Sequence, residues 1–128
     1  MLMFQDLLGK PFINHGRKDG FDCYGLAIEV SRRLGHKLYD LDYNQSTEDT
    51  FFRNVDGMLQ RKIEEDLLEV TTAKFGDLIL FADGKGRMVH IGVKLDGDDF
   101  IHCDKYGVRI AQLDTYYRKN RRFFTWQN

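Results

Sequence analysis

Three stretches of this chain hold residues that can perform nucleophilic chemistry together. Cys23 lies in the run 20–26 (GFDCYGL) at the expected start of a helix, whereas His90 and His102 lie in runs typical of strands. An unperturbed thiol titrates near 8.5, and a helix N-terminus or a nearby imidazolium lowers that pKa to about 3.5–7.5. The combination points to a cysteine hydrolase with Cys23 as nucleophile, His90 as base and His102 as the group that orients the base.

The helix that positions Cys23 is expected to begin at Asp22 or Cys23. Asp22 is a candidate N-cap and loop-orienting residue, Leu26 and Val30 stand one turn apart on an apolar stripe, and Gly35 is a candidate C-cap. The first N–H groups of a helix have no partner within the helix, so those beside the sulfur can stabilise an oxyanion. The helix start then serves both thiol activation and transition-state binding.

The two histidines lie on strands joined by a short turn, and the length of that turn decides whether they meet. A two-residue turn between the runs 88–95 and 99–103 would place His90 and His102 on opposite faces. A three-residue loop over 96–98 pairs Gly92 with His102 and places the histidines diagonally on one face, roughly 5–8 Å apart at Cβ. The catalytic interpretation predicts this loop or an equivalent bulge. The roles of the two histidines can be exchanged, and only geometry decides between them.

The remaining pattern predicts an α+β fold in which N-terminal helices pack on an antiparallel sheet, with the strands following as a meander. The 128 residues suit one domain, 1–128. We expect a turn over 5–9, a loop over 10–20, a second helix from about 47 to 68 followed by a strand, and further strands over 78–81, 108–110 and 123–126, the last as an edge strand.

Composition and charge narrow the function classes. The net charge of -1 offers no bulk positive field for nucleic acid. No apolar run approaches the roughly 20 residues that cross a bilayer, so membrane insertion is not expected. The opening residues fall short of a signal-peptide apolar region, which predicts synthesis in the cytoplasm without a signal peptide.

Two alternatives compete with these interpretations. Cys103 beside His102 could form a Cys₂His₂ zinc site with Cys23 and His90. However, adjacent strand residues point to opposite faces, and the spacing of zinc knuckles is missing. We therefore expect Cys103 in the core, no metal and no cofactor. The run 116–126 mixes aromatic with basic residues, which can stack on bases, but a charged turn beside a strand explains it better at this net charge.

The order of these motifs resembles that of the NlpC-type cell-wall peptidases, a papain-like cysteine hydrolase family, and especially its bacteriophage tail-associated branch. The resemblance runs from about residue 8 to the end of the chain. It rests on LGKPF at 8–12, FDCYGL at 21–26, GDLILF at 76–81, HIGV at 90–93 and FIH at 100–102.

The resemblance implies that Cys23 is the nucleophile, His90 the base and His102 the orienting residue. The implied reaction is hydrolysis of amide bonds in peptidoglycan stem peptides through an acyl-enzyme, with other phage tail proteins as partners. The protein would then be carried in the phage tail as part of the virion. The alternative is a mainly structural tail-assembly or tail-tip protein that keeps the fold with little or no activity.

Three residues near the nucleophile are expected to take part in binding: Phe12, Asp22 and Tyr24. Phe12 stands where the family usually has a tyrosine. Tyr24 stands where bacterial members have a serine implicated in substrate binding. An exposed aromatic surface around Phe123 and Trp126, or a blocked cleft, would favour the structural alternative.

Overall fold

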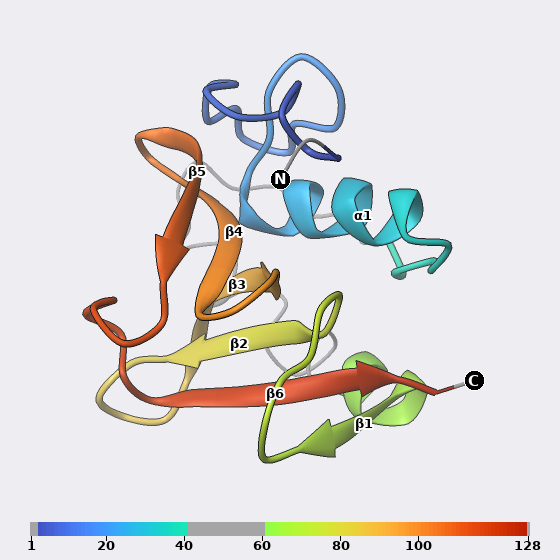
Figure 1. Ribbon diagram of the computed structural model, residues 1–128, viewed down its shortest axis with the longest axis vertical. Coiled ribbons are helices and arrows are strands. Elements are labelled where there is room, and N and C mark those ends of the chain that lie inside the picture. Colours follow the sequence, from blue (N-terminus) through green and yellow to red (C-terminus); the bar gives the residue numbers. More distant parts are fainter. Residues whose placement is uncertain (1–2, 41–60, 128) are drawn as a thin grey trace.

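The computed structural model describes residues 3–40 and 61–127, in which a long helix near the N-terminus packs on a six-stranded antiparallel sheet (Figure 1). This is the α+β architecture that the sequence predicts. No helix among these residues has the length and apolar character needed to cross a bilayer. The elements are α1 (Cys23–Arg33), β1 (Leu67–Val70), β2 (Leu78–Ala82), β3 (Met88–Lys94), β4 (Asp99–Asp104), β5 (Gly107–Gln112) and β6 (Arg121–Trp126).

The strand order is β1-β6-β2-β3-β4-β5, so the predicted meander is right for β2 to β5 and wrong for β6. The last strand returns across the sheet and pairs with both β1 and β2, which makes it central rather than an edge strand. The physical reason lies in its side chains. Phe124 packs into the cluster below α1, and Phe123 packs against the cluster on the opposite face. A strand with an apolar side chain on each face belongs inside a sheet.

Local signals at both ends explain why α1 forms where it does. Asp22 caps the N-terminus by accepting a hydrogen bond from the backbone N–H of Gly25 at 2.7 Å. At the other end Gly35 has a φ of 88°, and the N–H groups of Gly35 and His36 bond to carbonyls of the last turn in a Schellman motif. The predicted start of the helix is therefore confirmed, whereas the C-cap is Leu34 and Gly35 is the residue that follows it.

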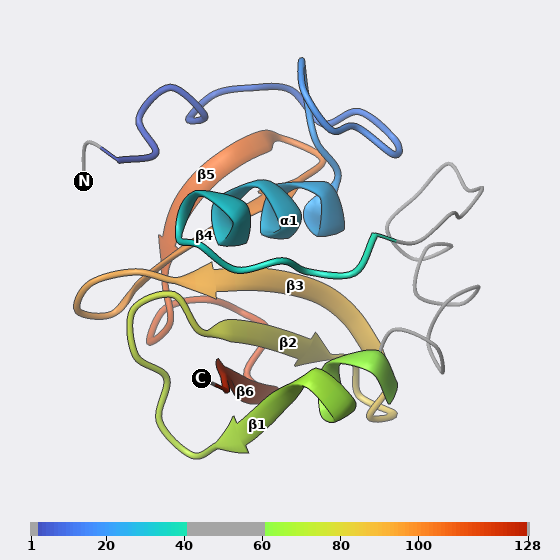
Figure 2. The same ribbon diagram turned by 90° about the vertical axis from the view of Figure 1, so that its right-hand side faces the viewer.

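The sheet separates two apolar clusters. On one face α1 packs against β3 and β4, and its buried residues join those of the core strands. Figure 2 shows α1 running along β3, with β4 and β5 curving up beside it. The other face carries a smaller cluster around Ile79, Phe81 and Phe100. Burial of a leucine, valine or phenylalanine side chain stabilises by about 1.5–3 kcal/mol, so the larger cluster dominates the stability of this arrangement.

The segments before α1 and before β1 agree in part with expectation. Residues 3–9 form turns, and the loop that follows is tied to β5 through the bonds Gly9 N–H to Val108 O and Val108 N–H to Lys10 O. Residues 61–66 are helical and β1 begins at Leu67, close to the predicted change near residue 68. The rest of the predicted second helix lies outside the described residues.

Candidate active site

Cys23 is the first residue of α1, as predicted, and its surroundings hold the helix start in place. The Asp22 carboxylate accepts hydrogen bonds from the backbone N–H groups of Gly25 and of His15, at 2.7 and 3.1 Å. Arg17 adds an ion pair to the same carboxylate at 3.3 Å. A capping carboxylate that is balanced by a guanidinium places less uncompensated negative charge beside the thiol. Asp22 therefore fixes both the loop and the first turn that presents Cys23.

The β3–β4 hairpin has the three-residue loop that the catalytic interpretation requires. Leu95 and Asp99 are bonded through Leu95 N–H to Asp99 O at 2.9 Å, and Val93 pairs with Ile101. Gly97 lies within the loop with a φ of 60°. This conformation costs a glycine little and lets the chain turn within three residues.

The two histidines consequently share one face of the sheet and lie in contact. Nε2 of His90 is 2.8 Å from Nδ1 of His102, and their ring planes are nearly perpendicular. One of these nitrogens donates to the other, and the tautomers decide the direction. Gly92 lies close beside this pair, and a Cβ at this position would come within 3.0 Å of the Phe100 ring and 3.2 Å of the Ile101 carbonyl oxygen.

Aromatic rings enclose this histidine pair. Tyr116 contacts both, with ring centroids 6.4 Å from His90 and 5.2 Å from His102, and Phe81 and Phe100 contact one histidine each. His90 and His102 are 0% and 1% exposed. Burial, reinforced by the neighbouring His90, lowers the pKa of His102 from its usual 6.5 to about 3. The His102 ring is therefore neutral at physiological pH.

Side chains along β3 alternate between the two faces of the sheet except at Val89. Ile91 and Val93 face the cluster below α1, and His90 faces the opposite side with Phe81. Strand alternation would place Val89 with the former group, but it lines the groove described below. A bulge explains the difference, because Phe81 pairs with His90 whereas Ala82 pairs with Met88, which leaves Val89 as an extra residue.

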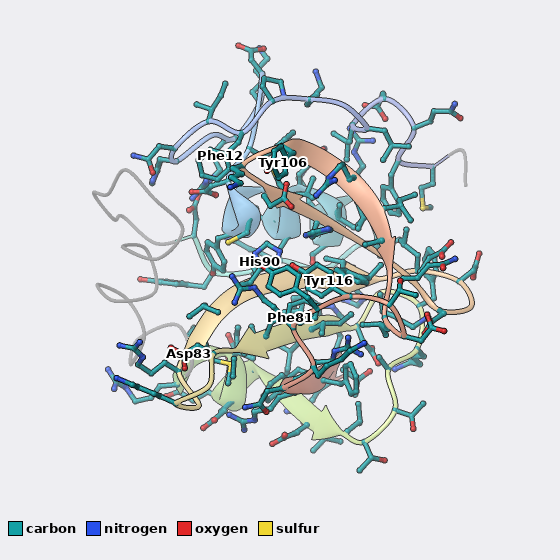
Figure 3. The ribbon with its side chains drawn as sticks, turned by 90° about the vertical axis from the view of Figure 1, so that its left-hand side faces the viewer. Phe12, Phe81, Asp83, His90, Tyr106 and Tyr116 are labelled. Carbon is teal, nitrogen blue, oxygen red and sulfur yellow. The ribbon has the colours of Figure 1, made fainter. Side chains whose placement is uncertain are left out.

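An open groove of about 1210 Å³ runs along the histidine face of the molecule. Figure 3 shows Asp83 toward one end, Phe12 and Tyr106 toward the other, and His90, Phe81 and Tyr116 between them. His102 and Tyr116 line the groove, whereas Cys23, at 2% exposure, and His90 do not. The lining comes from Phe12 and Val89, from the β4–β5 hairpin, and from residues 115–118 between β5 and β6.

The three residues predicted to take part in binding lie in different places. Phe12 lines the groove beside Tyr106. Asp22 is buried in its capping role, and Tyr24 is fully buried with its hydroxyl donating to the carbonyl of Tyr39. Burial also raises the pKa of Tyr24. Within the described residues only Phe12 is placed to touch a ligand in this groove, and a binding role for all three stays a prediction.

Cys103 lies in the core, as predicted. It is 0% exposed, and its thiol donates to the carbonyl of Phe21 with the sulfur 3.0 Å away. It belongs to the cluster below α1, while His102 faces the opposite side of β4. The four residues of the zinc alternative therefore do not converge, and residues 3–40 and 61–127 contain no group of three or more possible metal ligands.

Tyr116 is the feature of this site that the sequence did not reveal. Its place in the mixed aromatic and basic run 116–126 was explained as a charged turn beside a strand. The turn instead returns over the sheet, which places the Tyr116 ring on the histidine pair. Proximity of this kind depends on the path of the β5–β6 connection, which carries no local sequence signal.

Comparison with known proteins identifies the family to which this fold belongs. The profile of the NlpC/P60 family matches residues 9–127. The chain belongs to the NlpC/P60 family. Its α+β architecture is the papain-like fold of that family. No curated protein matches the chain.

Solved structures of NlpC/P60 domains share the fold at low sequence identity. The NlpC/p60 domain of peptidoglycan hydrolase SagA has a TM-score of 0.63 and 20% identity, over 96% of this chain and 92% of that one. An NlpC/P60 family protein from Bacillus cereus ATCC 10987 has a TM-score of 0.65 and 23% identity. NlpC1 from Trichomonas vaginalis has a TM-score of 0.68 and 20% identity. These cover 97% and 98% of this chain, which spans only 38% and 42% of theirs.

Proposed function

We propose that this NlpC/P60 chain is a cysteine peptidase that hydrolyses amide bonds in peptidoglycan stem peptides through a thiol acyl-enzyme. The observation that carries the proposal is the 2.8 Å contact between His90 and His102 on strands that pack against the helix beginning at Cys23. Family membership supports the same chemistry, and one structural neighbour is named as a peptidoglycan hydrolase.

The state of His102 supports His90 as the base. A ring whose pKa is about 3 does not take up a proton at neutral pH, so His102 stays neutral and, in the tautomer protonated on Nε2, accepts through Nδ1. His90 then carries its proton on Nε2, toward His102, and offers Nδ1 to the thiol of Cys23. The orienting ring thus fixes the tautomer of the base, as the third member of a triad does.

The reaction follows from these assignments. His90 takes the Cys23 proton, and the thiolate attacks the amide carbonyl carbon. The oxyanion forms at the start of α1, where the Cys23 N–H and the helix dipole stabilise it. The carbon–nitrogen bond breaks as the His90 imidazolium gives its proton to the leaving amine. Water, activated by His90, then releases the acyl group and regenerates the thiol.

The decisive test compares two thiol variants on purified peptidoglycan, with the released fragments identified by mass spectrometry. Cys23→Ala is expected to abolish hydrolysis while the circular dichroism spectrum stays that of the parent. Cys103→Ala is the matched control, because it removes a buried thiol on the same side of the sheet without touching the nucleophile. Hydrolysis by Cys23→Ala at the parent rate would refute the proposal.

A second candidate is a structural domain with little or no activity. The burial of the Cys23 thiol favours it. Cys23 is 2% exposed and His90 is 0% exposed, so a substrate reaches the sulfur only after neighbouring side chains move. Alkylation by iodoacetamide at pH 6 separates the two functions, because an activated thiolate reacts where a protonated thiol does not. The peptidase predicts that Cys23 reacts much faster than Cys103. Two equally inert thiols in the native protein would favour the structural domain.

We also propose a bacteriophage tail as the setting, with other tail proteins as partners. Its support is the resemblance of the motif at 21–26 to the tail-associated branch, in which an aromatic residue follows the cysteine as Tyr24 follows Cys23. Mass spectrometry of purified particles tests this setting. Absence of the chain from particles whose other tail proteins are detected would refute it.

A further inference from the structure

The connection between β5 and β6 contains an arginine whose charge is not balanced within the described part of the chain. Arg118 lines the groove together with His102 and Tyr116. Its Nε is buried and makes no hydrogen bond, and no ion pair joins its guanidinium to residues 3–40 or 61–127. A buried donor of a charged group without an acceptor is costly. An anion entering the groove would supply the missing acceptor.

Two other charged groups along the groove already have an ion-pair partner. Arg109 pairs with Asp104 at 2.6 Å, and Asp83 pairs with Arg87 at 2.8 Å. Lys105 lies 5.1 Å from the centroid of the Tyr106 ring, which is 70% exposed and marks the outer rim. Arg118 is therefore the groove arginine whose planar fork is left to bind a ligand.

The segment that carries Arg118 is held firmly. Arg121 donates from Nε to the carbonyl of Arg118 at 2.9 Å and from Nη2 to the carbonyls of Leu113 and Tyr116. The Arg118 guanidinium also lies over the Tyr117 ring, 5.0 Å from its centroid. The backbone of Arg118 is fixed, and its guanidinium rests on a ring face. Such a guanidinium loses little entropy when it binds a carboxylate with two parallel hydrogen bonds.

Ring contacts connect this arginine to the histidine pair. Tyr116 lies 5.2 Å from the ring of His102 and 5.0 Å from that of Tyr117, over which Arg118 stacks. A ligand group held by Arg118 would therefore lie near the amide that reaches the histidines. Stem peptides carry free carboxylates, which match the charge and planarity of the guanidinium.

We propose that Arg118 binds a free carboxylate of the substrate and so selects acidic peptides with that carboxylate close to the scissile amide. This inference rests on the proposed peptidase function and adds a specificity-determining residue to it. Arg121 is a positioning residue, because it acts through the backbone of residues 113–118 rather than on the ligand.

The test measures peptide binding by isothermal titration calorimetry, using the Cys23→Ala protein so that no hydrolysis occurs. The probes are one stem peptide with all carboxylates free and versions with each carboxylate amidated in turn. One amidated version is expected to bind about tenfold or more weakly than the acid. Adding Arg118→Gln removes that preference, and Arg118→Lys restores only part of it because lysine lacks the planar fork.

The matched control is Arg32→Gln, which makes the same change of charge on the far side of α1, where Arg32 pairs with Glu29. If Arg118→Gln and Arg32→Gln keep the same preference, or if no peptide binds, the carboxylate site is refuted. Cleavage assays with Cys23 intact give an independent readout. An enzyme that cleaves acid and amidated peptides equally refutes the role of Arg118 but keeps the peptidase. A chain that is inactive but binds the acid peptide through Arg118 refutes the peptidase function and keeps the role of Arg118.

Discussion

Acidification should destabilise the fold through His102 before most carboxylates titrate. The ring has a pKa of about 3 in the folded protein, because it is buried and faces His90, and 6.5 in the unfolded chain. Between these values the unfolded state binds a proton that the folded state does not. Stability is therefore fully present above pH 6.5 and falls as the pH decreases, with the loss ending near pH 3.

The size of the loss follows from the same two values. Each pH unit below 6.5 costs about 1.4 kcal/mol from this single group, so about 3 kcal/mol is lost by pH 4.5. The ring is 1% exposed, so little solvent screening reduces the effect. Since small domains have about 5–15 kcal/mol of total stability, a loss of this size is readily measured.

Urea unfolding from pH 7.5 to 4.5 checks this value, followed by the fluorescence of Trp126, the single tryptophan. The comparison is with His102→Asn, which keeps a polar side chain at this position but does not titrate in this range. The stability of the parent should fall below that of the variant by a further 3 kcal/mol or so across this range, whatever their difference at pH 7.5. Parallel curves for the two proteins would refute the assignment of a neutral, buried His102.

Two further predictions concern the framework around the site. Asp22→Ala should lower the free energy of unfolding by about 1–2 kcal/mol, because the Gly25 N–H loses its hydrogen-bond acceptor. Asp22→Asn retains that bond and should cost less. Thermal denaturation measures both variants, and equal losses would contradict the capping role. Gly92→Ala should cost about 1–3 kcal/mol, because the new Cβ would lie 3.0 Å from the Phe100 ring and 3.2 Å from the carbonyl oxygen of Ile101, the residue before His102. Peptidoglycan hydrolysis should fall in the same variant, and unchanged activity would show that the histidine pair tolerates displacement.

Much of this site was predictable because its signals are local. Asp22 before an apolar stripe indicates a capped helix start, and its side chain needs only the backbone three residues ahead. The spacing around Gly97 sets the hairpin loop, and the loop length sets which face His102 occupies. Both predictions depend on contacts between residues close together in the chain.

Other features depend on contacts between residues far apart in the chain. The insertion of β6 between β1 and β2 joins residues about 40 to 59 positions apart. The bulge that turns Val89 into the groove is set by pairing with β2. Neither has a local cause. The prediction of an edge strand at 123–126 failed because strand identity is local, whereas strand neighbours are chosen by burial on both faces.

By itself, the sequence determined the place of a thiol at a helix start and of two histidines on paired strands, and it made their shared face depend on the length of one hairpin loop. Only the tertiary structure decided their environment. It enclosed the histidines under Tyr116, kept His102 neutral by burial, and left the Arg118 guanidinium in the groove without an acid among residues 3–40 and 61–127. The physical reason is that desolvation and long-range packing depend on which distant segments meet, and local residue patterns do not encode those meetings.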